Sequence, residues 1–262
     1  MIGLVRPSGD PREISKQCGF PARLTSVFEP AYASYASACP RFDDSFPKAG
    51  LPDADRTELM ALYGKNRDLL REAAISAQPL DSYSRSRCQL CGLSELRDLD
   101  HYLGQSAFPE FAIHPFNVVP TCGKCNTSRK TFDDGGQRRI LHLYFDDPWE
   151  LPQMVQATIV GTAPGLVAKY AVQISTASSL ELLFTRQWEV LRLRERYEAL
   201  APAKLKELTR TCSRQRSRVA VQKILHEQAA DYEEDRGLND WEVALCRAAA
   251  ASNDFLQGCG VP

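Results

Sequence analysis

The sequence lacks any apolar run that approaches the roughly 20 residues needed to span a bilayer. Its first 20 residues, "MIGLVRPSGDPREISKQCGF", also lack the basic start and following apolar segment of a secretory leader. From these two absences we expect a cytoplasmic protein with no membrane partner.

An excess of charge of one sign is also missing, since 32 Lys and Arg face 33 Asp and Glu, for a formal net charge of -1. This balance excludes a strongly basic protein that coats nucleic acid, although a local basic face can still bind phosphates. No GxxxxGK[ST] motif occurs, so any dependence on ATP would have to come from another chain.

The chain has no disulfide pattern, because its nine cysteines are an odd number and five of them are scattered. The other four form two Cys-x-x-Cys pairs, Cys88 with Cys91 and Cys122 with Cys125, with thirty residues between the pairs. Two such pairs can supply four thiolates in the tetrahedral arrangement that zinc prefers. Four thiolates leave no open position for water or substrate, so we expect a structural Zn2+ ion.

The segment between the pairs contains Asp100-His101 and Asn117, and Asn126 follows the last cysteine. "RDLDHYL" and "FNVVP" have the pattern of short strands, and "CGKCNTSRK" that of a helix start, which predicts a strand-loop-strand-helix hairpin clamped by zinc. Successive strand residues point to opposite faces, so Asp100 and His101 can line one site only if the strand ends there.

These residues fit the hydrolysis of a phosphodiester. Asp and Asn offer hard oxygen ligands, which suit Mg2+ or Mn2+ and leave most coordination positions to water and phosphate. A histidine such as His101 can deprotonate water near neutral pH, and a bound ion can stabilise charge that develops on the phosphate.

The order Cys-x-x-Cys, Asp-His, Asn, Cys-x-x-Cys-Asn over about residues 85–131 resembles the HNH endonuclease family and its ββα-metal fold. The resemblance implies a nuclease that acts on DNA, with His101 as general base and Asp100 and Asn126 as ligands of the catalytic ion. It also implies that Asn117 braces the loop and orients His101. By the same resemblance, Arg129 and Lys130 lie near DNA phosphates.

Longer segments resemble bacterial HNH proteins of defence islands, including the nuclease subunit of Septu-type antiphage systems. The similar segments are "LDHYLGQSAFPEFAIHPFNVVPTCGKCN", "LHLYFDD" and a terminal "W…AL…FL". This similarity implies a role in antiphage defence and an ATPase partner subunit, for which residues from about 176 to 262 would be the docking region. The alternative is that these residues only complete the core.

The whole chain therefore predicts an α+β fold with the HNH hairpin embedded among helices. We expect an N-terminal helical and loop cap over residues 1–80, the nuclease core over 81–150, and a β-hairpin with C-terminal helices over 151–262. Within the cap, residues 1–50 are expected to be weakly organised with one short helix, and "RTELMALYGKNRDLLREAAIS" to form an amphipathic helix. Near the C-terminus we expect three helices, separated at Pro202 and Gly237.

Other interpretations remain open at this point. The metal frame fits a zinc-stabilised nucleic-acid or protein-binding module without catalysis, and the same ion and base fit an HNH-type RNase. His142 could line the site beside Asp146 or Asp147, or could simply be packed. Four arginines on an expected helix form either a solvated face or a surface that binds phosphates. They are Arg210, Arg214, Arg216 and Arg218.

Overall fold

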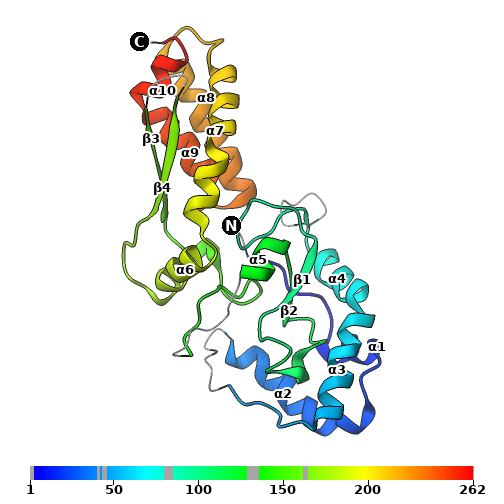
Figure 1. Ribbon diagram of the computed structural model, residues 1–262. Helices are drawn as coiled ribbons and strands as arrows, with labels where there is room; N and C mark the ends of the chain where they lie inside the picture. Colours follow the sequence, from blue (N-terminus) through cyan, green and yellow to red (C-terminus); the bar gives the residue numbers. More distant parts are fainter. Residues whose placement is uncertain are drawn as a thin grey trace. The chain divides into compact units, whose positions relative to one another are not determined.

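A computed structural model of the chain describes residues 3–39, 42, 46–79, 85–128, 136–161 and 165–261. These residues form an α+β structure that is mostly helical and contains two small antiparallel hairpins (Figure 1). The chain divides into two compact units, Gly3–Asp147 and Pro148–Pro262, where the sequence suggested three regions. In the described part of the chain, no helix is both long and apolar enough to cross a membrane.

The first unit packs helices against a hairpin of two four-residue strands. Strand β1 pairs antiparallel with β2, α4 packs on β2, and α5 packs on β1. The strand-loop-strand-helix order expected between the cysteine pairs is therefore present as β1, β2 and α5. The elements of this unit are α1 (Pro11–Gln17), η1 (Ala22–Leu24), α2 (Thr25–Ala38), α3 (Asp53–Lys65), α4 (Arg67–Ser76), β1 (Asp98–His101), η3 (Pro109–Phe111), β2 (Val118–Thr121) and α5 (Gly123–Ser128).

Helix α2 is a correction to the sequence prediction, which treated this stretch as part of a weakly organised region. Phe28, Tyr32 and Tyr35 lie on one helix face and are all buried. The Tyr35 ring packs against Phe111 with 5.0 Å between ring centroids. Burial of three aromatic rings supplies the stability that local propensity does not, and it holds the helix together through Pro30.

The amphipathic helix expected over residues 56–76 is present as two helices. Asn66 leaves the helical conformation between α3 and α4, with φ -116° and ψ 17°. Its side-chain amide donates to the Leu62 carbonyl at 2.8 Å and to the Cys18 carbonyl at 2.9 Å, so the break is stabilised by hydrogen bonds. Tyr63 and Arg67 lie on either side of this break.

The second unit begins with the predicted β-hairpin, which the structure confirms. Strands β3 and β4 pair in register from Val155 opposite Val172 to Val160 opposite Val167. Helix α9 packs against β3 and α7 against β4, as Figure 1 shows. Residues 162–164 of the expected turn lie outside the described residues. The elements are η4 (Pro148–Glu150), β3 (Val155–Val160), β4 (Val167–Val172), α6 (Ser179–Val190), α7 (Leu193–Cys212), α8 (Arg218–Arg236), α9 (Trp241–Ala251) and α10 (Asn253–Gly258).

The three predicted C-terminal helices are five in the structure. Arg192 adopts a left-handed conformation, with φ 50°, and separates α6 from α7. Pro202 lies inside α7 rather than ending a helix, because Ala201 and Leu205 on either side of it are buried in the core. Gly237 follows the end of α8 with φ 83°, as the sequence predicted.

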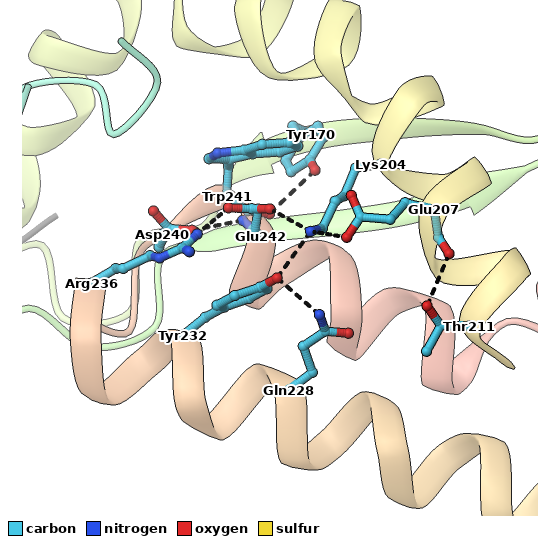
Figure 2. A network of polar contacts seen from close by, with 10 residues as sticks. All are labelled: Tyr170, Lys204, Glu207, Thr211, Gln228, Tyr232, Arg236, Asp240, Trp241 and Glu242. Carbon is cyan, nitrogen blue, oxygen red and sulfur yellow. Dashed lines mark hydrogen bonds and ion pairs between the residues drawn. The ribbon is translucent and has the colours of Figure 1, made fainter. Parts of the chain in front are cut away.

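A half-buried polar network joins α7, α8 and α9 (Figure 2). The Lys204 ammonium lies 3.0 Å from a carboxylate oxygen of Glu242 and donates to the Tyr232 hydroxyl at 2.9 Å. Arg236 also pairs with Glu242, so one carboxylate binds cations from two different helices. Each charge in this low-dielectric region has a partner, which favours this one packing of the three helices over others.

Asp240 lies beside this network and carries an unusual carboxyl group. Its Oδ1 atom accepts a hydrogen bond from the Glu242 amide at the start of α9, at 2.9 Å. Its Oδ2 atom is buried and has no hydrogen-bond partner among the described residues. Burial raises the pKa of Asp240 to about 6, from an ordinary value of 3.8.

This pKa predicts that Asp240→Asn stabilises the protein in a pH-dependent way. The folded state holds the Asp240 proton more tightly than the unfolded chain, so the ionised carboxylate lowers the free energy of unfolding as pH rises through about 4 to 6. Asparagine keeps the helix cap without the charge. We expect a gain of up to about 3 kcal/mol near pH 8 that disappears below about pH 4.

Urea unfolding at a series of pH values measures this difference, with Asp231→Asn on the exposed surface of α8 as the control. An Asp240→Asn effect that is the same at every pH would show that the carboxyl is not perturbed by burial.

Candidate functional site

The four cysteines of the two Cys-x-x-Cys pairs converge in the first unit. Their sulfur atoms all lie within 4.8 Å of one another, and all four residues are buried. The sulfurs of Cys91 and Cys122 are 3.9 Å apart. Tetrahedral zinc with Zn–S bonds of about 2.3 Å requires sulfurs roughly 3.8 Å apart. The cluster can therefore hold a structural zinc ion, as the sequence predicted.

Backbone hydrogen bonds position the two cysteines of each pair. The Cys91 and Gly92 amides both donate to the Cys88 carbonyl, at 3.2 and 2.7 Å, which closes a tight turn around the first pair. Gly92 has φ 68°, a left-handed conformation that residues with a side chain rarely adopt. The second pair opens α5, where the Asn126 amide donates to the Cys122 carbonyl at 3.0 Å.

The thiols of the cluster perturb one another's ionisation. Hydrogen bonds from Cys125, and then from Cys88 and Cys91, hold the pKa of the Cys122 thiol well below its usual range. The pKa of Cys88 is raised, mainly because its thiol donates to Cys122. A bound Zn2+ ion would favour the thiolate form of all four cysteines.

The candidate metal ligand Asp100 and the candidate base His101 lie on opposite faces of strand β1. Leu99 and His101 are buried, whereas Asp98 and Asp100 are partly exposed on the opposite face. The strand ends at His101, which is the condition the sequence set for Asp100 and His101 to serve one site.

The face with the acidic residues meets the start of α5. A side-chain carbon at Gly123 would lie only 3.1 Å from the Asp98 Oδ2 atom, so glycine allows a close approach between helix and strand. Asn126 is three residues after Gly123 on the helix, and Asp100 is two residues after Asp98 on the strand. These periodicities place both side chains on the faces that meet at the β1–α5 junction. The Oδ2 atom of Asp100 is buried.

His101 is held in one orientation by the loop between the strands. Its Nε2 atom lies 2.8 Å from the Ala112 carbonyl oxygen, and only 8% of the residue is exposed. A carbonyl can only accept a hydrogen bond, so the ring proton lies on Nε2 and Nδ1 is the basic nitrogen. The Tyr63 ring packs edge-on against the imidazole, with centroids 4.3 Å apart.

Asn117 braces the same loop. Its side-chain oxygen accepts from the Leu103 amide at 2.7 Å, and its side-chain nitrogen donates to the carbonyls of Leu103 at 3.0 Å and Phe111 at 3.1 Å. The residue is fully buried. Its contacts reach both ends of the loop segment that leads to Ala112, the partner of His101. The catalytic role that the sequence suggested for Asn117 remains a prediction.

A buried polar chain continues from Asn117 to His142. The Tyr35 hydroxyl donates to the Asn117 side-chain oxygen at 2.9 Å and lies 3.1 Å from His142 Nε2. His142 Nδ1 accepts from the Tyr144 amide at 3.3 Å, so the ring proton lies on Nε2 and is donated to Tyr35. Asp146 accepts from the His142 amide at 2.6 Å and pairs with Arg138. His142 is therefore a packed residue and does not line the site, and its hydrogen bond to Tyr35 supports the loop.

The sequence analysis missed three residues at β1, which are Asp98 in the strand itself and Tyr63 and Arg67 beside it. The Tyr63 hydroxyl donates to the Leu99 carbonyl at 3.0 Å, and Arg67 lies 3.8 Å from the Asp98 carboxylate. The pKa of Tyr63 is raised, first by burial and further by the charge of Asp100, while Arg67 opposes the change. Only Asp98 had a signal in the sequence, because the alternation in "RDLDH" puts it on the same face as Asp100. Arg129 and Lys130 lie outside the described residues.

Comparisons with known proteins leave the family of this chain open. The chain is 31% identical over 120 residues to Protein ea31 of Escherichia phage lambda. This match covers 44% of the chain, and the chain spans only 40% of the length of the phage protein. No protein-family model matches the sequence, and no solved structure matches it either.

The cysteine cluster predicts that the purified protein contains close to one zinc ion per chain. We expect Cys88→Ser or Cys122→Ser to lose the ion and to unfold the region around residues 85–128, because metal binding contributes much of the folding free energy of so small a hairpin. Elemental analysis and hydrogen exchange measure the two effects. Cys18→Ala, which removes a buried thiol outside the cluster, should keep its zinc. A folded wild-type protein without zinc would contradict the assignment.

The polar chain predicts that Tyr35→Phe loosens the loop that positions His101. Loss of one buried hydroxyl that bridges two side chains should lower the free energy of unfolding by about 1–2 kcal/mol. Exchange of the Leu103 amide, which is bonded to Asn117, should become faster. Tyr144→Phe is the matched control, because its buried hydroxyl bonds the Val118 carbonyl and not the loop. Equal Leu103 exchange rates in both variants would show that Tyr35 does not support the loop.

Proposed function

We propose that the first unit is a metal-dependent endonuclease that hydrolyses phosphodiester bonds in DNA. The main support is the end of β1, where a histidine of fixed orientation follows a carboxylate with one buried oxygen. Both belong to a hairpin whose base carries the four-thiol cluster. The motifs that resemble those of HNH nucleases thus lie before, on and between two strands and a helix, β1, β2 and α5.

His101 is suited to remove a proton from water. Its Nε2 proton is donated to the Ala112 carbonyl, which stabilises the imidazole when Nδ1 gains a second proton. The surrounding Tyr63 ring and the braced loop restrict rotation of the imidazole. A base that is already oriented needs no reordering in the transition state, which is a main source of catalytic rate.

Asp100 and Asn126 are the residues that would hold Mg2+ or Mn2+. The Asp100 carboxylate, whose Oδ2 atom is buried, and the Asn126 amide offer the oxygen ligands that these ions prefer. Two protein ligands leave the remaining positions to water and phosphate. When bound, the ion would stabilise the negative charge that develops on the phosphate and on the leaving oxygen.

Two other functions would use the same hairpin. A hydrolytic mechanism needs no 2′-hydroxyl, so cleavage of RNA uses the same residues, and a zinc-stabilised binding module would use the hairpin without catalysis. The predicted role in antiphage defence and the ATPase partner come from resemblance alone, and the phage protein that matches part of the chain gives them no support.

The proposed function predicts that His101→Ala abolishes nicking of supercoiled plasmid DNA while zinc content and thermal unfolding stay close to wild type. Loss of a general base typically lowers rates by about 10²- to 10⁴-fold. We expect Asp100→Ala and Asn126→Ala to raise the concentration of Mg2+ or Mn2+ needed for half-maximal cleavage. His226→Ala, which removes an exposed histidine of α8, is the matched control and should cleave normally.

Cleavage by His101→Ala at the wild-type rate would refute the assignment of the base. If the wild-type protein binds DNA but cleaves neither DNA nor RNA with any divalent ion, the binding module is the correct interpretation. An RNA substrate cleaved in preference to DNA would identify the RNase alternative.

A further inference from the structure

The four arginines singled out in the sequence lie at the corner where α7 meets α8, not along one helix. Arg210 is in the last turn of α7, Arg214 and Arg216 are in the connecting residues, and Arg218 begins α8. All four are exposed. We call these four residues the arginine corner. Its place between two helices corrects the sequence prediction of a single cationic helix.

The backbone of the arginine corner is held in place from both sides. Cys212, at the end of α7, is fully buried, and its carbonyl accepts from the Gln215 amide at 2.9 Å. The Ser217 side chain accepts from the Ala220 amide and caps α8. The Arg218 guanidinium donates to Asn253 of α10 at 2.7 Å. The cations therefore project from an ordered turn, at the end of α8 where the helix dipole is also positive.

Little negative charge opposes the arginine corner. Among the described residues, Arg210, Arg214 and Arg216 form no ion pair, and Glu207, the closest acid along α7, already binds Lys204 at 2.9 Å. Another acid, Asp254, follows Asn253, the hydrogen-bond partner of Arg218. The first acid of α8, Glu227, pairs with Lys223 at 3.7 Å, and it lies about 14 Å along the helix from Arg218. This distance exceeds the screening length of about 8 Å at physiological salt, so the corner keeps a net positive potential.

We propose that the arginine corner binds the phosphodiester backbone of a nucleic acid. Guanidinium groups bind phosphate oxygens through paired hydrogen bonds, and four of them within nine residues match the closely spaced charges of such a backbone. The contact is independent of sequence, and it gives a nearly neutral chain an anchor for its substrate. This proposal deepens the nuclease function proposed above, from which the choice of nucleic acid follows.

The test removes the three unpaired cations and keeps Arg218, whose bond to α10 supports the fold. The full-length Arg210→Gln, Arg214→Gln, Arg216→Gln variant is compared with a control of equal charge, Lys169→Gln, Arg192→Gln, Arg194→Gln. The control cations are exposed in the same unit, and Lys169 and Arg192 already pair with acids. Both sets carry His101→Ala to prevent cleavage. Fluorescence anisotropy then measures binding to duplex DNA and to a single strand of the same sequence over a range of salt concentrations.

Each phosphate contact contributes about 0.9 to the slope of log affinity against log salt for duplex DNA and about 0.7 for a single strand. We expect the arginine-corner variant to bind roughly 10- to 100-fold more weakly on at least one of the two DNAs, with a slope smaller by about 2–3. The control should match its parent. Equal affinities and slopes for the two variants would overturn the proposal, as would loss of a co-purifying protein partner with DNA affinity unchanged.

The outcome is separable from that of the nuclease function. Weaker binding by the arginine-corner variant, together with a wild-type protein that cannot cleave, would support the corner and refute the nuclease. Cleavage by the wild-type protein together with unchanged binding by the variant would do the reverse.

Discussion

The convergence of four buried thiols is the constraint on which the hairpin of the first unit depends. Strands β1 and β2 have four residues each and α5 has six, and elements of this length are not stable on their own. A structural zinc ion can contribute about 10–16 kcal/mol in small zinc-binding peptides, which exceeds what such short elements gain by packing. The cluster joins the turn before β1 to the start of α5, and β1 and α5 are the two elements that carry Asp100 and Asn126.

A second set of contacts fixes the loop that the cluster does not reach. Helix α2 buries its aromatic face and delivers the Tyr35 hydroxyl to Asn117 and His142. Asn117 in turn fixes the loop segment that carries Ala112, the hydrogen-bond acceptor of His101. The N-terminal helices are thus part of the support for the candidate base, although they contribute no ligand to the metal cluster.

The sequence predicted those parts of the site that depend on short spacings. The cysteine pairs, the two strands between them, the helix start at Cys122 and the later β-hairpin are each encoded within a few residues, and all of them are present. Helix α2 was missed because its stability comes from aromatic residues that pack against the distant Phe111. Tyr63 and Arg67 were missed for the same reason, since nothing near them in the chain indicates β1 as their neighbour. The predicted helix boundary at Pro202 was wrong because the buried neighbours of Pro202 hold α7 together across it.

We propose that one hairpin carries two different metal sites, a closed one made by four thiolates and an open one at the junction of β1 and α5. Anomalous diffraction from crystals soaked in Mn2+, recorded at the zinc and manganese absorption edges, tests it most directly. We predict a zinc peak among the four cysteine sulfurs and a separate manganese peak within ligand distance of Asp100 and Asn126. A zinc peak with no manganese at the β1–α5 junction would contradict the claim.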